Sequence, residues 1–186
     1  MKPIKFIAKN ILISAAAMIT LAGALAGCTA NNDAPLATVS AVDLTRYQGK
    51  WFEVALLPNR FQAICVADTQ AEYQADGDAI RVINRCRKID GSIEQVNGIA
   101  KIVEGSNNSK LRVSFFRPFY GNYWILALDP AYQWVLVGEP GRKYGWILSR
   151  SPTLSPALLD GALDKAVSLG YMRADFHISP QTSPLN

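Results

Sequence analysis

Three cysteines and one histidine are the residues of this 186-residue chain best suited to chemistry. A cysteine thiolate can act as a nucleophile or a metal ligand, or the thiol can be consumed in a disulfide. His177 is the only histidine and has no cluster of other ligands around it, so a metal centre is not expected. Its place in the C-terminal tail also argues against a Ser-His-Asp triad. We therefore expect no cofactor and no catalytic residue.

Residues 1–27 have the pattern of a secretory signal. Three lysines near the start precede an apolar run over residues 11–26, which ends in small side chains. A transmembrane helix is the alternative, because a run of about 20 apolar residues can span a bilayer. Three of the 19 basic residues lie in this segment, so the remainder has 16 basic and 15 acidic residues and a net charge of +1. Such a balance favours neither nucleic acid nor an acidic partner.

The signal ends in Leu25-Ala26-Gly27-Cys28, which resembles the lipobox of bacterial lipoproteins. The resemblance implies that Cys28 becomes the lipid-modified first residue of the mature chain and holds it on a membrane. Thr29, rather than aspartate, follows Cys28. In such lipoproteins this implies the outer membrane, and we expect the domain to face the periplasm. Residues 28–42 are then expected to form a lipidated tether.

Short segments rich in Val, Ile, Phe, Tyr and Trp alternate with turns from residue 43 onward. Residues 67–74 show the alternation best, because every even position is polar. Strands are expected over 49–57, 67–74, 80–86, 93–103, 110–116, 122–129, 132–138 and 144–150. Eight strands with short connections predict an all-β, antiparallel up-and-down barrel with room for one small ligand. A β-sandwich is the main alternative.

A helical period replaces the strand period after residue 152. Apolar side chains repeat at helical spacing, with Ser155 as N-cap, Pro156 in the first position and Gly170 at the end. We expect one C-terminal α-helix over about 155–169, packed on the outside of the barrel, and a short strand near 176–178. The barrel and helix would then occupy residues 43–180, followed by a tail at 181–186.

The block Tyr47-Gln48-Gly49-Lys50-Trp51-Phe52-Glu53-Val54 resembles the opening Gly-x-Trp block of the lipocalins, and specifically of their bacterial outer-membrane members. Further blocks follow in family order over 113–121, 123–129 and 146–152, so the resemblance covers about residues 43–178. One block departs from the pattern, because Leu128-Asp129-Pro130 stands where Thr-Asp-Tyr is usual. The resemblance implies a lipocalin barrel and a hydrophobic ligand.

Gly49, Trp51 and Arg150 are expected to close one end of this barrel. In the family, the arginine lies across the tryptophan of the first strand, and a guanidinium over an indole contributes roughly 0.5 to 2 kcal/mol. Gly49 would let the chain pass close to this pair. These residues are therefore assigned to the fold rather than to a ligand.

The inward face of each strand follows from the two-residue period, starting from Arg150 on the last strand. Ala127 is also expected inside, although ordinary core packing is the alternative for every such residue. The cavity candidates are Thr69, Ala71, Tyr73, Val82, Asn84, Leu111, Val113, Phe115, Tyr123, Ile125, Trp146 and Leu148. Glu53 shares the face of Trp51 and needs a partner, expected to be Arg150, Asn84 or a backbone amide unless a bend turns it outward.

Cys65 and Cys86 are expected to form a disulfide, because export places them in an oxidising compartment. A hairpin that turns near Gly77 would not place them directly opposite each other, so a bulge or an irregular start of the strand is needed. If both thiols were free, one of them could serve as a nucleophile.

The expected function is binding and storage or transport of a fatty acid, such as palmitate, or a lysophospholipid, in support of membrane maintenance. The apolar lining suits an acyl chain, and no ring of positive charge is expected deep in the barrel. Four cationic side chains in loops could contact an anionic head group, and ordinary surface charge is the alternative interpretation. They are Arg60, Arg117, Arg142 and Lys143. The alternatives are a lipocalin-fold enzyme with a cavity cysteine and a pigment or haem binder, for which His177 would be the ligand.

Overall fold

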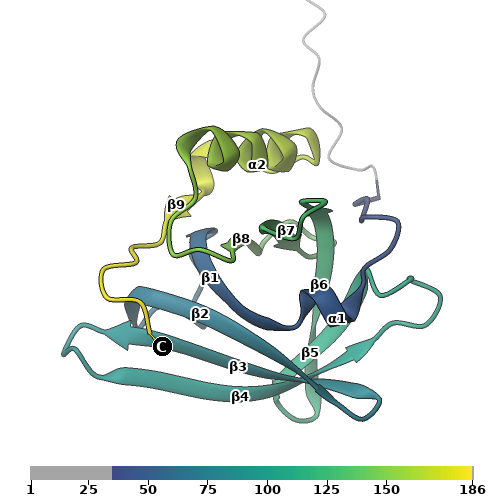
Figure 1. Ribbon diagram of the computed structural model, residues 1–186, viewed down its shortest axis with the longest axis horizontal. Helices are drawn as coiled ribbons and strands as arrows, with labels where there is room; N and C mark the ends of the chain where they lie inside the picture. The colour runs from purple at the N-terminus through teal and green to yellow at the C-terminus, as the bar shows by residue number, and fades with distance from the viewer. Residues whose placement is uncertain (1–34, 186) are drawn as a thin grey trace, which may run out of the picture. The chain divides into compact units, whose positions relative to one another are not determined.

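Eight antiparallel strands form a closed barrel in the computed structural model, which describes residues 35–185 (Figure 1). The strands are β1 (Gly49–Leu56), β2 (Cys65–Asp76), β3 (Ala79–Lys88), β4 (Ile93–Ile102), β5 (Lys110–Phe116), β6 (Phe119–Leu128), β7 (Trp134–Gly138) and β8 (Gly145–Ser149). Each strand pairs with the next, and β1 pairs with both β8 and β2, which closes the sheet. The predicted up-and-down barrel is confirmed, and the sandwich alternative is wrong.

The predicted helix is α2 (Pro156–Ser168), which lies across the outside of the barrel (Figure 1). The Ser155 hydroxyl accepts a hydrogen bond from the amide of Leu158 and so caps the first turn. Small and branched residues of the helix (Ala162, Leu163 and Ala166) are buried against the outward face of β1, β6, β7 and β8. After a 3-10 turn, η1 (Arg173–Asp175), the short strand β9 (His177–Ile178) pairs with β1.

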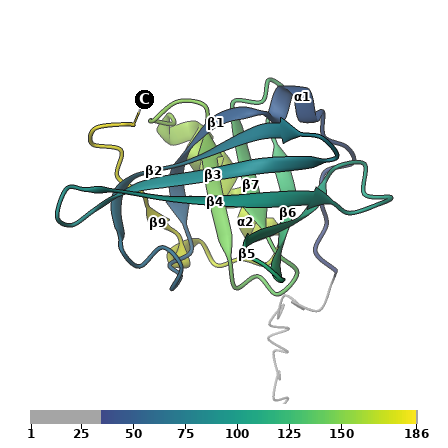
Figure 2. The ribbon, with the colours of Figure 1, turned by 90° about the horizontal axis from the view of Figure 1, so that it is seen from below.

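The segment that precedes the barrel is packed against it over residues 36–42. Leu36 and Val42 are buried, and the amide of Val39 donates to the carbonyl of Ile125 at 3.0 Å. The short helix α1 (Leu44–Tyr47) follows and covers one end of the barrel, which we call the closed end (Figure 2). The tether expected over 28–42 therefore does not extend to residue 42.

Residues 1–34 lie outside the described part, so the signal, Cys28 and the start of the tether are not seen. Within residues 35–185, no helix is long and apolar enough to cross a membrane.

The C-terminal tail (residues 179–185) fills a gap between β1 and β2. These strands pair directly only from Gly49 to Phe52, and β9 then takes the place of β2 beside β1. The Gln181 side chain donates to the carbonyls of both Glu53 and Thr69, at 2.9 and 2.8 Å. Residues 181–185, which the sequence marks only as a tail, therefore help to complete the barrel wall.

Two apolar clusters divide the core. One fills the barrel and includes Trp51, Leu111 and Ile125, whereas the other lies between the barrel and α2. Ala127 belongs to the outer cluster, so its expected inward position is wrong. The physical reason is a register shift between Ile125 and Ala127, which inverts the alternation of side chains in β6.

Candidate functional site

The closed end of the barrel is plugged by Trp51 and Arg150. The guanidinium carbon of Arg150 lies 3.9 Å from the centre of the Trp51 ring. Its two terminal nitrogens donate to the carbonyls of Lys50 and Arg46, at 2.8 and 2.6 Å. Gly49 has a φ of +88°, and a Cβ atom there would lie 3.5 Å from Arg150. This guanidinium ties α1 to β1.

Three tyrosines form the floor above this plug. The hydroxyls of Tyr47 and Tyr73 both hydrogen-bond to the hydroxyl of Tyr123, at 2.7 and 2.8 Å. Burial raises the pKa of all three phenols above the ordinary value, so they remain neutral. Sequence reasoning placed Tyr73 and Tyr123 here but missed Tyr47, which α1 folds inward so that its carbonyl accepts from the Trp51 indole.

The interior changes from packed to open along the barrel. On β5, Leu111 is fully buried, Val113 is half-buried and Phe115 is 41% exposed. On β4, Ala100 is fully buried whereas Val96 is 41% exposed. Exposure therefore rises from the closed end toward the other end, which we call the open end.

Most of the predicted cavity residues lie in or against the interior cluster. They are Ala71, Tyr73, Val82, Leu111, Val113, Tyr123, Ile125, Trp146 and Leu148. The other three lie nearer the open end. Asn84 pairs with Ala71 and with Val96, and its side-chain oxygen is buried without a hydrogen-bond partner among the described residues. Thr69 lines a small pocket beside β9, and Phe115 packs on Gly98 of β4.

A chain of polar side chains crosses the open end. The indole of Trp146 donates to the Gln62 side-chain oxygen at 2.7 Å. The Gln62 amide nitrogen donates to one oxygen of Glu53 at 2.6 Å, and the Ser179 hydroxyl donates to the other at 2.6 Å. Glu53 is only 4% exposed, and this burial raises the pKa of its carboxyl. None of the partners expected for Glu53 was right, because a loop and the tail supply the donors instead.

Aromatic rings continue this chain toward solvent. Trp146 stacks on Tyr144 with ring centres 6.2 Å apart, and Tyr144 contacts Phe61 at 5.8 Å. Phe61 and Gln62 belong to the same loop between β1 and β2. This loop therefore borders the way into the interior.

Comparison with known proteins agrees with this geometry. A family model described as a lipocalin-like domain matches residues 42–181. The chain belongs to the lipocalin family. The resemblance noted in the sequence is therefore confirmed.

Similar lipocalins come from distant organisms. The outer membrane lipoprotein Blc of Vibrio cholerae is 38% identical over 136 residues, which cover 72% of this chain and 79% of the relative. Temperature-induced lipocalin-1 of Arabidopsis thaliana is 36% identical over 153 residues, which cover 77% of this chain and 82% of the relative. The structure of insecticyanin from Manduca sexta matches with a TM-score of 0.65 at 23% identity, covering 78% and 84%, and shows the fold alone. Membership of the family implies that this lipocalin binds a hydrophobic ligand.

The disulfide of this lipocalin joins Cys65 and Cys86, with Cα atoms 5.5 Å apart. In the ladder Cys65 stands opposite Lys88, and the register shifts twice between Cys65 and Gln70. This irregular start of β2 brings the two cysteines together at the open end. Since both thiols are consumed, the nucleophile alternative has no free thiol within residues 35–185.

The lone histidine of this lipocalin lies outside the barrel. His177 is exposed on β9, where it pairs with Leu56. It therefore cannot ligate a haem held inside the barrel. Nor do the described residues contain a group of three or more His, Cys, Asp or Glu side chains that could hold a metal ion.

Proposed function

We propose that this lipocalin binds the acyl chain of a fatty acid or lysophospholipid in its interior and stores or transports it at the outer membrane. The observation that carries the proposal is the graded interior, which is apolar, sealed at one end and increasingly exposed toward the other. An acyl chain that enters from the open end would contact Val113 and Trp146 before it meets the tyrosine floor. Each buried methylene contributes about 0.8 kcal/mol, so a long chain can offset the cost of association.

The rim of the open end supports a lipid as the ligand. Two of its loops and the strand ends beside a third turn carry large apolar side chains that are each more than half exposed, namely Phe61, Ile64, Ile89, Phe116 and Phe119. A surface of this kind favours contact with other apolar material. It would lower the cost of passing an acyl chain between a membrane and the barrel.

Attachment to the outer membrane rests on the lipobox at Cys28 and on the relatives that are named outer membrane lipoproteins. A lipid anchor would hold the open end near its source of ligand. We propose that the domain faces the periplasm.

A pair of substitutions on neighbouring strands tests the interior site. Val113→Trp enlarges a half-buried side chain that packs against the interior cluster, and it is expected to weaken palmitate and lysophospholipid binding at least tenfold. Asn122→Trp adds the same ring at an exposed position of β6, next to the inward Tyr123, and is the matched control. Binding is measured by displacement of a fluorescent fatty acid from the purified protein.

Circular dichroism checks that both variants fold. Equal affinities of Val113→Trp and the wild type, or no displacement by either lipid from the wild type, would overturn the proposed function.

A further inference from the structure

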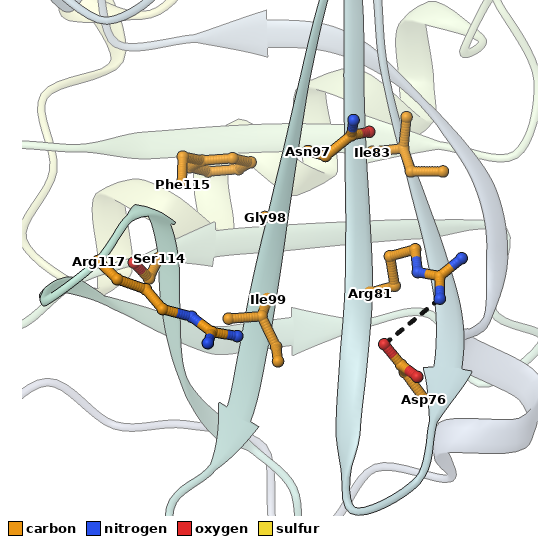
Figure 3. Close-up of a pocket in the computed structure, with 9 residues that line it drawn as sticks. All are labelled: Asp76, Arg81, Ile83, Asn97, Gly98, Ile99, Ser114, Phe115 and Arg117. Atoms are coloured by element: carbon orange, nitrogen blue, oxygen red, sulfur yellow. Dashed lines mark hydrogen bonds and ion pairs between the residues drawn. The ribbon is translucent and has the colours of Figure 1, made fainter.

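The strands β4 and β5 pair over only part of their length, which leaves an opening in the barrel wall. These strands pair only from Ile99 to Ile102 of β4 and from Leu111 to Ser114 of β5. Beyond Ser114 the register of β5 shifts as it turns toward β6. A groove of about 510 Å³ opens at this point (Figure 3).

The groove lies mainly on the outer face of the wall. Alternation places Arg81, Ile83 and Ile99 on the face opposite Val82, which belongs to the interior cluster. Gly98 pairs with Val82 and so faces inward, and a Cβ atom there would approach the ring of Phe115 to within 2.6 Å. Phe115 is therefore the side chain of the groove that reaches the inner side of the wall. Figure 3 shows Arg81 and Arg117 on either side of Ile99.

Polar side chains in the groove have hydrogen-bonding capacity and charge that could serve a ligand. The Ser114 hydroxyl is buried and has no hydrogen-bond partner among the described residues. The single carboxylate in the lining is Asp76, which lies 3.5 Å from Arg81, and both side chains are about half exposed, at 48% and 54%. An exposed ion pair of this kind contributes little to stability, so Arg81 can leave Asp76 and bind a more highly charged anion.

The surrounding face adds positive charge. Lys101 and Arg112 stand directly opposite each other on β4 and β5. Like charges in this position destabilise a sheet. Both lie against the ring of Tyr120, at 5.9 and 5.7 Å from its centre. A bound anion would relieve this repulsion.

We propose that the groove is a second binding site, which takes the phosphate head group of a single-chain lipid. Arg81 and Arg117 would hold the phosphate, since guanidinium groups match phosphate oxygens with paired donors. The Ser114 hydroxyl would supply a further donor. The start of the acyl chain would lie against Ile83 and Ile99. This site is outside the barrel, so it does not depend on ligand binding in the interior.

Dodecyl phosphate is the probe, and backbone amide shifts in NMR spectra of the purified protein are the readout. Saturable shifts are expected at Ile99 and Ser114. Inorganic phosphate, which lacks the chain, is expected to bind at least tenfold more weakly, and dodecyl maltoside, which lacks the charge, is expected not to shift these amides. The Trp146 indole signal reports the interior site in the same titration.

The double substitution Arg81→Gln/Arg117→Gln is expected to weaken the groove response at least tenfold and to leave the Trp146 response unchanged. Arg85→Gln/Arg173→Gln removes the same charge from a partly exposed position on β3 and an exposed position after α2, both outside the groove, and is the control, expected to retain both responses. Groove shifts that survive the first double substitution, or that dodecyl maltoside also produces, would overturn the second site. A Trp146 response without groove shifts would overturn the second site and leave the proposed function standing.

Discussion

The surroundings of Glu53 disfavour the charged form of its carboxyl group. It is buried at the open end and hydrogen-bonds to two neutral groups, the Gln62 amide and the Ser179 hydroxyl. A buried carboxylate is costly without a cation, which explains why burial raises its pKa. The protonated form is therefore the one that the fold favours.

Glu53→Gln is expected to change how stability depends on pH. Because the pKa of Glu53 is raised in the folded state, its stabilising contribution is complete below the unfolded pKa of about 4.3 and is lost as the pH rises through the folded value. The variant should therefore gain stability relative to the wild type as the pH rises above about 4.3. A tenfold change in proton affinity is worth about 1.4 kcal/mol, so the size of the gain measures how far the pKa is raised. Urea unfolding at several pH values measures it.

Glu72→Gln is the control, since hydrogen bonds from Gln74 and Arg85 lower the pKa of Glu72. Its stability relative to the wild type should change in the opposite direction with pH. A constant difference between Glu53→Gln and the wild type would contradict the prediction.

A contact between two residues was predictable where each residue lies in a sequence block typical of the family. Trp51 and Arg150 meet as expected, because each lies in a block typical of the family. The partners of Glu53 were not predictable, because Gln62 lies in an irregular loop and Ser179 lies far along the chain. Contacts made by loops and tails leave no period in the sequence.

Strand positions were predictable up to the places where the register shifts. All eight expected strands are present, because alternation and turn residues mark each of them. Ala127 was assigned to the wrong face because a bulge in β6 leaves no mark in its apolar sequence. The irregular start of β2 was foreseen only because Cys65 and Cys86 required it.

The C-terminal tail depends on Asp68. This carboxylate is fully buried, accepts from the amides of Thr182 and Ser183, and pairs with Arg87 at 2.6 Å. Burial opposes its charge, but the hydrogen bonds from Ser183, Arg87 and Thr182 lower its pKa. The tail is therefore held most firmly when Asp68 is ionised.

Asp68→Asn is expected to release the tail and to destabilise the protein by about 2–3 kcal/mol at neutral pH. Because the pKa of Asp68 is lowered in the folded state, this contribution is present above about pH 3.9 and is lost as the pH falls through the folded value. Urea unfolding measures the loss, and hydrogen exchange at the amides of Thr182 and Ser183 should become faster.

Asp76→Asn, which removes an exposed carboxylate paired with Arg81, should change neither quantity appreciably. Unaltered exchange at Thr182 in Asp68→Asn would show that this carboxylate does not hold the tail.

The whole molecule combines a ligand-binding barrel with a proposed anchor at Cys28. Cys28→Ala is expected to abolish incorporation of an alkyne-labelled fatty acid and to move the protein out of the membrane fraction. Cys65→Ser/Cys86→Ser removes the disulfide but should retain the label. Persistent labelling of Cys28→Ala would place the lipid elsewhere or contradict the anchor.

The pairing of β1 with β8 and β9 also sets the order in which the chain can fold. The first strand of the barrel finds its last partner at Ile178, so the wall is incomplete until almost the entire chain is available. Bringing such distant segments together costs chain entropy before the new contacts repay it, which slows folding. A chain exported as proposed would therefore remain unfolded during synthesis through its topology alone, and would complete its barrel only after its C-terminus had crossed the membrane.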